Sequence, residues 1–128
     1  MKTKRSETPH GLRNGRAWAE SITEMLARLD SDDPEIRDTA ESEIQESPLS
    51  VEVRSGWTCP GHEMEAEEYM ILLSTGGPAL RIVGDIGQFN EPSTARLEWQ
   101  DWGTPWAEVD EYDSESVLRF ARIVGPCL

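Results

Sequence analysis

The first third of the chain carries apolar residues at helical spacing. They fall at i, i+4, i+7, i+8 and i+11 and so share one helical face: Trp18, Ile22, Met25, Leu26 and Leu29. This pattern predicts a helix that begins at Asn14 or Gly15, since either residue can serve as its N-cap. Residues 1–13 are polar and basic and include Pro9 and Gly11, so we expect them to form a flexible tail.

A second helix is predicted after residue 33. Asp33 is a good N-cap, Pro34 suits the first helical position, and Pro48 ends the helix. The apolar positions of this segment form only a thin line: Ile36, Ala40 and Ile44. We therefore expect a largely polar helix that lies on the surface.

After Pro48 the hydrophobic period changes from that of a helix to that of a strand. Apolar and polar residues alternate in LSVEVRSGW (residues 49–57), as in a half-buried strand. The segment YMILLSTGGPALRIVGDIG (residues 69–87) predicts two strands joined by a tight turn at Gly76–Gly77. A further strand in PSTARLEWQDW (residues 92–102) has two distinct faces, one with Ala95, Leu97 and Trp99 and the other with Arg96, Glu98 and Gln100.

A last helix is predicted near the end of the chain, capped by Asp113 or Ser114 and ended by Gly125–Pro126. Its expected apolar face consists of Val117, Leu118, Ala121 and Val124. Because helices and strands are segregated along the chain, the fold class is α+β. We expect a single domain over residues 14–128, with two N-terminal helices, an antiparallel sheet of three to five strands and a C-terminal helix.

The charge of the chain is strongly negative and unevenly distributed. Twelve basic and 25 acidic residues give the chain a net charge of −13. Residues 31–128 carry a net charge of −15, and residues 1–30 carry +2. Such a body repels nucleic acid and anionic membranes and attracts basic surfaces, most of which belong to nucleic-acid-binding proteins. The same charge also keeps a protein soluble, so charge alone leaves both interpretations open. The chain has no signal peptide or membrane span in its sequence pattern, and we expect it in the cytoplasm.

Motifs for metal binding and catalysis are weak. Cys59 and His62 have a chelating spacing, but a structural zinc site needs four ligands and the remaining candidates, His10 and Cys127, lie near the chain ends. The glycine-rich segment STGGPALRIVG lacks the Lys-Ser/Thr pair of a phosphate-binding loop. We therefore predict no metal site, no cofactor and no catalytic residue, although 25 acids leave a carboxylate pair for acid–base chemistry open.

Acidic residues gather in three clusters. The first surrounds the second predicted helix and contains Asp30, Asp32, Asp33, Glu35, Asp38, Glu41, Glu43 and Glu46. Within it, Glu35, Asp38 and Glu41 are three residues apart and lie on neighbouring turns. Like charges at this spacing cost a few tenths of a kcal/mol per pair, so helix stability does not explain them. The second cluster spans Glu63–Glu68. The third follows the tryptophans and contains Glu108, Asp110, Glu111, Asp113 and Glu115. Each cluster also fits a solvated face or a helix cap.

Three of the five tryptophans lie within eight positions. Trp99 shares a strand face with Leu97, which predicts that it belongs to the core. Trp102 falls on the opposite side and Trp106 follows Pro105 in a bend, so we expect one of these two to be at least half exposed. An exposed aromatic residue with an acidic rim is typical of an interaction hot spot, whereas burial of all three against the helices is the alternative.

Three segments carry a resemblance: PLSVEVRSGW, TGGPALRIVG and LEWQDWGTPW. They resemble uncharacterised small acidic proteins of plasmids, integrative elements and phages of proteobacteria, over residues 34 to 120 approximately. Where such accessory proteins have a known role, many are anti-CRISPR or anti-restriction proteins, small, acidic and non-enzymatic. The resemblance implies inhibition of host defence but carries over no functional residues.

The sequence therefore predicts a non-enzymatic inhibitor that occupies the basic surface of a nucleic-acid-handling complex, such as a Cas or restriction subunit. It is expected to bind neither nucleic acid directly nor a membrane. The predicted contact residues are Asp33, Glu35, Asp38, Glu41, Trp102, Trp106, Glu108, Asp110 and Glu111. A small carboxylate-using hydrolase and a structural or immunity-type partner of a neighbouring gene product are the alternatives.

Overall fold

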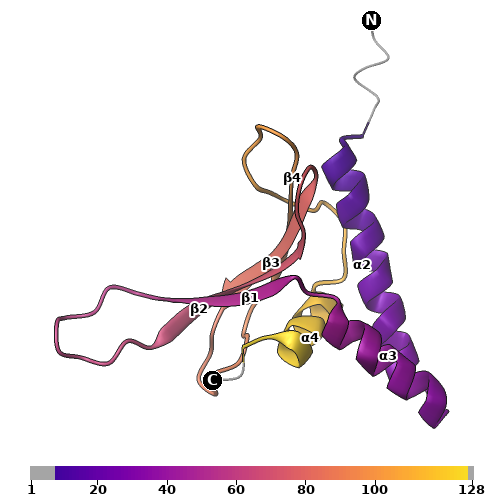
Figure 1. Cartoon of the computed structure of the whole chain (residues 1–128), viewed down its shortest axis with the longest axis horizontal. Helices are drawn as coiled ribbons and strands as arrows, with labels where there is room; N and C mark the ends of the chain where they lie inside the picture. Colours follow the sequence, from indigo (N-terminus) through magenta and orange to yellow (C-terminus); the bar gives the residue numbers. More distant parts are fainter. Residues whose placement is uncertain (1–7, 127–128) are drawn as a thin grey trace, which may run out of the picture.

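The fold combines three helices with one antiparallel sheet, as the computed structural model of residues 8–126 shows (Figure 1). The helices are α2 (His10–Leu29), α3 (Pro34–Glu46) and α4 (Ser114–Val124). The strands are β1 (Ser50–Ser55), β2 (Ala66–Ser74), β3 (Ala79–Asp85), β4 (Arg96–Gln100) and β5 (Ala107–Glu108). The predicted α+β class is thus confirmed, and the sheet has five strands.

The start of α2 differs from the sequence prediction. The helix begins at His10 with Pro9 as its N-cap, so residues 10–13 are helical and not part of a tail. Gly11 is buried, and its backbone N–H donates to the Asp101 carboxylate at 2.9 Å. This contact from a distant loop holds the first turn in place despite the low helix propensity of glycine. The rest of the predicted tail, residues 1–7, lies outside the described residues.

The sheet is a simple meander in the order β1-β2-β3-β4-β5, with every neighbouring pair antiparallel. The expected turn between β2 and β3 is present, and Gly76 adopts a φ of +91°, which favours glycine. Alternation of side chains gives the sheet two faces. Tyr69, Ile71 and Leu73 of β2 point to the buried face, whereas Met70 and Leu72 lie on the opposite, more open face.

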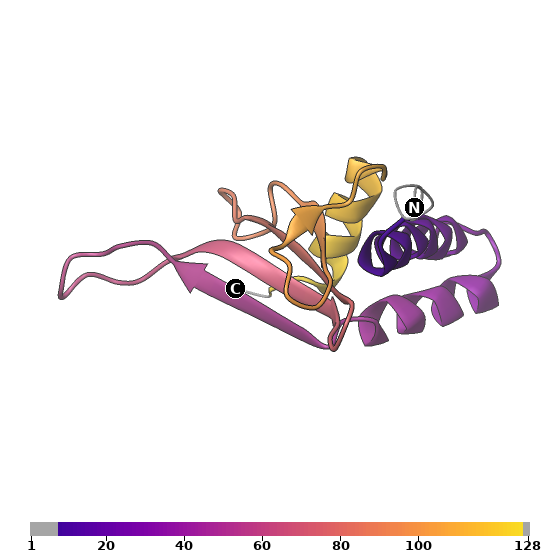
Figure 2. The ribbon, with the colours of Figure 1, turned by 90° about the horizontal axis from the view of Figure 1, so that it is seen from above.

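The core lies between one face of the sheet and the helices. Helices α2 and α4 pack against the central strands, and α3 packs against α2 and α4 (Figures 1 and 2). The largest fully buried side chains are Ile22, Ile44, Ile71, Leu80, Ile82, Pro92, Leu97, Val117 and Phe120. On α4 the predicted apolar face needs one correction, because Phe120 is fully buried and Leu118 is only half-buried. None of the helices in residues 8–126 is long and apolar enough to cross a bilayer.

The sheet extends beyond the helices that cover it. The β1–β2 hairpin and its loop, residues 56–65, project away from the helical layer (Figures 1 and 2). As a result, the apolar side chains of Leu49, Val51 and Val53 in and before β1 remain 60 %, 36 % and 44 % exposed. The predicted alternation of this strand is therefore present, but the helices leave its apolar side largely uncovered.

Candidate partner-binding surfaces

The N-terminal end of α3 is built by acidic residues with local structural roles. The Asp33 carboxylate accepts a hydrogen bond from the backbone N–H of Glu35 at 2.9 Å, and Pro34 occupies the first turn. The predicted N-cap is confirmed. Negative charge on Asp33 and Glu35 is also favoured by the helix dipole, whose positive end lies here. Helix capping therefore accounts for part of the first acidic cluster.

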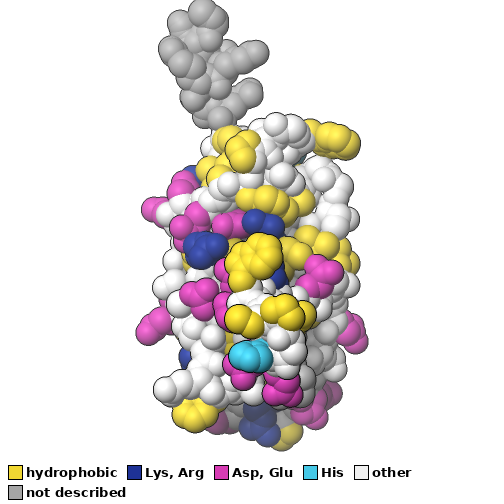
Figure 3. All heavy atoms as spheres, turned by 90° about the vertical axis from the view of Figure 1, so that its left-hand side faces the viewer, with side chains coloured by type: hydrophobic (Ala, Val, Ile, Leu, Met, Phe, Trp, Pro, Cys, Tyr) yellow, Lys and Arg dark blue, Asp and Glu magenta, His cyan; other side chains and the backbone are white. Residues whose placement is uncertain are grey.

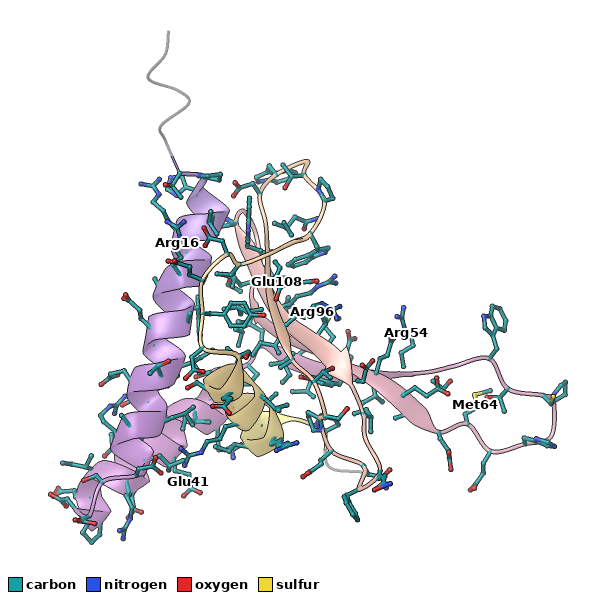
Figure 4. The ribbon with its side chains drawn as sticks, turned by 180° about the vertical axis from the view of Figure 1, so that it is seen from behind. Arg16, Glu41, Arg54, Met64, Arg96 and Glu108 are labelled. Carbon is teal, nitrogen blue, oxygen red and sulfur yellow. The ribbon has the colours of Figure 1, made fainter. Side chains whose placement is uncertain are left out.

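Asp38 and Glu41 have no such local role. Both are exposed, and neither carboxylate has a hydrogen-bond or ion-pair partner within residues 8–126. Figure 4 shows Glu41 at the helical end of the molecule, far from the hairpin loop that carries Met64. The nearest cation along α3 belongs to Arg37, whose guanidinium donates to the Ser31 carbonyl at 3.3 Å. This part of α3 presents free negative charge to solvent.

Other members of the first cluster are neutralised inside the chain. The guanidinium of Arg28 lies 2.8 Å from the Glu24 carboxylate and 2.7 Å from that of Glu43, so it ties α2 to α3. Arg119 of α4 pairs with Asp30 at 2.7 Å. These hydrogen bonds lower the pKa values of Glu43 and Asp30 from their usual range. The tertiary structure thus divides one acidic cluster into paired and free carboxylates.

The third cluster is largely used to hold the chain together. Asp110 accepts from Nε of Arg16 at 3.0 Å, and this hydrogen bond lowers the pKa of the Asp110 carboxyl. The Tyr112 hydroxyl donates to the Glu108 carboxylate; burial, and next this bond, raise the pKa of Tyr112 to about 12. Among the predicted contact residues here, Glu108 and Asp110 are thus engaged within the chain, while Glu111 is exposed.

One pair of acids lies directly across two strands. Glu98 of β4 and Glu108 of β5 are register partners. Arg81 offsets this like-charge contact, because its guanidinium lies 2.8 Å from the Glu98 carboxylate. Such a pair is the arrangement that a carboxylate-using hydrolase would need. Here Glu98 accepts a hydrogen bond from Arg81 and Glu108 accepts one from Tyr112, so both carboxylates have structural partners.

The tryptophans divide between core and surface. Trp99 packs against the core, as predicted, and a Cβ at Gly11 would come within 2.5 Å of its ring. Trp106 is half-buried and lies under Arg81, whose Cζ is 4.1 Å from the ring centroid. Trp102 is 86 % exposed, which fits the expectation that one of the two later tryptophans is at least half exposed. Its ring lies over the β2–β3 turn, where a Cβ at Gly77 would approach to 2.3 Å.

The predicted contact residues do not form one surface. Trp102 follows Asp101, which bonds to Gly11 at the beginning of α2. Asp33 lies beyond the opposite end of the same helix, and 20 residues of α-helix span about 30 Å. The α3 acids and Trp102 therefore belong to separate surfaces, because the length of α2 lies between them.

The sequence interpretation missed two exposed regions. Trp57 and Met64 in the β1–β2 loop are among the most exposed large hydrophobic residues. Figure 3, viewed toward that loop, shows hydrophobic side chains interspersed with acidic and basic ones. The open face of the sheet also holds a hollow of about 700 Å³, whose polar lining includes Glu52, Arg54 and Glu68. Arg54 and Arg96 lie along this sheet in Figure 4, and their carboxylate partners keep the face mixed in charge. The alternation of polar and apolar residues in β1 and β4 was the sequence signal that could have revealed this open face.

Residues 8–126 contain no group of three or more His, Cys, Asp or Glu side chains arranged to hold a metal ion. Cys59 and His62 are both exposed, and only a backbone hydrogen bond of 3.1 Å, from the His62 N–H to the Cys59 carbonyl, links them. Cys127 lies outside the described residues.

Comparison of the chain with protein-family models, curated proteins and solved structures finds no match. The resemblance to acidic proteins of mobile elements therefore stays a prediction.

Proposed function

We propose that this protein is a non-enzymatic inhibitor that binds a basic surface of a nucleic-acid-handling protein through the exposed acids of α3. The observation that carries the proposal is the free negative charge of Asp38 and Glu41 on the exposed side of α3. Residues three positions apart on a helix have Cβ atoms roughly 5–6 Å apart, so Asp38 and Glu41 place two negative charges side by side for Lys or Arg side chains. Glu35 extends the same row toward the helix N-terminus.

The distribution of positive charge supports this choice of surface. Seven arginines form ion pairs within residues 8–126: Arg16, Arg28, Arg54, Arg81, Arg96, Arg119 and Arg122. Arg28 reaches α3, where it pairs with Glu43, and the other six neutralise acids elsewhere in the fold. The excess negative charge of a −13 chain is left on surfaces such as α3. It steers a basic partner toward the protein and repels nucleic acid.

The proposed partners are Cas or restriction subunits of a bacterial host, acting in the cytoplasm. Their nucleic-acid-binding grooves are basic, and an acidic helix in such a groove excludes DNA or RNA by direct competition. Electrostatic attraction of this kind is screened by salt, since the Debye length falls from about 30 Å at 0.01 M to about 8 Å at 0.15 M. Binding should therefore be fast and should weaken as salt is raised.

The test begins with a pull-down from a host that carries CRISPR and restriction systems, at low and at high salt. The expected result is a Cas or restriction subunit that is recovered at low salt and lost at high salt. Recovery of one dedicated, neighbouring-gene product at both salts would instead support the immunity-type alternative. Recovery of no basic protein at either salt contradicts the proposal.

A matched pair of variants then locates the surface. Asp38→Lys with Glu41→Lys changes α3, and Glu63→Lys with Glu65→Lys changes the hairpin loop. Both double variants raise the net charge by the same four units, from −13 to −9. The two variants therefore have the same net charge, and a difference between them reports on where the charge lies. We expect the α3 variant to bind the recovered subunit about tenfold more weakly than the loop variant, a difference of about 1.4 kcal/mol. Equal affinities of the two variants would rule out α3 as the contact surface.

A further inference from the structure

Strand β1 forms a free edge of the sheet. Within residues 8–126 it pairs only with β2, and the opposite edge consists of the two residues of β5. An edge strand presents a row of unpaired backbone N–H and C=O groups that can pair with another strand. Natural edges are often protected by proline, lysine or a covering element. The segment SVEVRS of β1 contains neither proline nor lysine.

The side chains of β1 have the pattern of an inner strand. Val51 is opposite Ile71 and Val53 is opposite Tyr69, so both valines lie on the face where β2 contributes to the core. Even so, Val51 and Val53 stay exposed, because the helices cover the sheet only as far as β2 at this end (Figure 2). Among the described residues, the strand therefore has no neighbour on its outer edge and little cover on its apolar side.

We propose that a second copy of this chain pairs with β1, antiparallel and about a two-fold axis at Val53. The two five-stranded sheets would then join into one continuous sheet. In this register Val53 lies opposite the partner's Val53, on the apolar side. Glu52 lies opposite the partner's Arg54, and Arg54 lies opposite the partner's Glu52. Opposite charges placed directly across an antiparallel pair are stabilising.

The chemistry of β1 favours this register over its neighbours. Directly opposed residues must point to the same face of a sheet, so the axis has to pass through a residue and not between two residues. An axis at Glu52 would oppose two glutamates, and an axis at Arg54 would oppose two arginines. An axis at Val51 would place Glu52 opposite a serine. Only the axis at Val53 makes two Glu–Arg pairs at once.

The apolar side of β1 adds to the contact in the same register. Leu49, Val51 and Val53 are all exposed in the single chain, and a strand paired along β1 would bury part of this apolar area. This inference is independent of the proposed function, because β1 and the free acids of α3 are different surfaces.

The experiment reverses charges on β1 and measures mass in solution by sedimentation equilibrium. It uses about 0.15 M salt, where the Debye length of about 8 Å limits the mutual repulsion of two acidic chains. The wild-type protein should show a concentration-dependent dimer between about 1 µM and 1 mM. Glu52→Arg and Arg54→Glu should each weaken this dimer about tenfold or more, because each creates two like-charge contacts. Glu63→Arg, which makes the same charge change as Glu52→Arg but in the loop, should leave the dimer intact.

Mixing the two variants provides the decisive outcome. A chain with Glu52→Arg and a chain with Arg54→Glu are complementary in this register, so an equimolar mixture should form a 1:1 heterodimer, identified by native mass spectrometry. The double variant E52R/R54E should dimerise with itself for the same reason. Circular dichroism confirms that each variant is folded. A wild-type protein that stays monomeric at all concentrations overturns the proposal, and so does a dimer that both single reversals leave unchanged.

Discussion

Gly15 offers a test of how α2 packs on the rest of the fold. It lies in the first half of α2, five residues after the first residue of the helix. A Cβ at this position would lie 2.6 Å from Cγ2 of Val109, a buried side chain that follows β5. Real Cβ atoms do not approach a neighbour this closely. The substitution Gly15→Ala therefore sets the helix propensity of alanine against a steric clash.

The two effects can be weighed with ordinary magnitudes. Alanine in place of glycine in a helix interior gains about 1 kcal/mol. Overpacking of a filled site costs about 1–3 kcal/mol. We therefore expect Gly15→Ala to lower the free energy of unfolding by up to about 2 kcal/mol. Val109→Ala alone should cost about 2 kcal/mol, through lost burial and a small cavity. In that background Gly15→Ala should instead stabilise the protein by about 1 kcal/mol, because the new methyl group fills the space.

The assay is a double-mutant cycle on the free energy of unfolding in urea, followed by circular dichroism. The expected coupling between the two substitutions is about 1–3 kcal/mol and favourable. Ala17→Gly, at an exposed position of the same helix, serves as the control and should cost about 1 kcal/mol in both backgrounds. If Gly15→Ala stabilises the wild-type protein as much as it stabilises the Val109→Ala variant, Gly15 does not pack closely against Val109 and the reasoning is refuted.

Two further predictions concern the core and the ion pairs. Phe120→Ala removes a fully buried ring and should lower the free energy of unfolding by about 3–5 kcal/mol. Phe89→Ala, at an exposed position, should change the same free energy by less than about 0.5 kcal/mol. Equal effects of the two substitutions in urea denaturation would contradict the assigned core. The hydrogen bond from Arg119 lowers the pKa of the Asp30 carboxyl below its usual 3.8. The stability contributed by this ion pair is therefore fully present above pH 3.8, and it is lost as the pH falls through the lowered pKa. The difference in urea midpoint between wild type and Arg119→Gln should therefore narrow between about pH 7 and about pH 3, and a difference that does not change with pH would refute this role.

Local rules predicted much of the secondary structure. Asp33 and Asp113 cap α3 and α4 because an aspartate accepts a hydrogen bond from an N–H two residues later, an interaction that needs only the local chain. The turn at Gly76 and the alternation in β4 depend on neighbouring residues in the same way. A helix start that depends on a distant contact was not predictable. α2 begins at His10 because Gly11 meets Asp101, 90 residues away.

The candidate site shows the same division. Sequence alone identified the acidic residues and the tryptophan-rich segment, and its net charge of −13 predicted a preference for basic surfaces. It could not show which carboxylates are free, because ion pairing joins residues far apart in the chain. Arg16 neutralises Asp110 across 94 positions, and Arg119 neutralises Asp30 across 89. Asp38 and Glu41 keep their charge free because no arginine of the described chain is brought to them.

Exposure of apolar residues was likewise decided by packing. The period of two in LSVEVRSGW is a property of the sequence, and it determined that Val51 and Val53 share one side of a strand. Whether that side is buried depends on how far the helices reach across the sheet. On α4 the sequence contained both Leu118 and Phe120, and only the packing of the helix against the rest of the fold placed Phe120 in the core. Periodicity thus determined the elements and their faces, whereas the tertiary structure decided which faces are covered and which charges are neutralised, because both depend on contacts between distant segments.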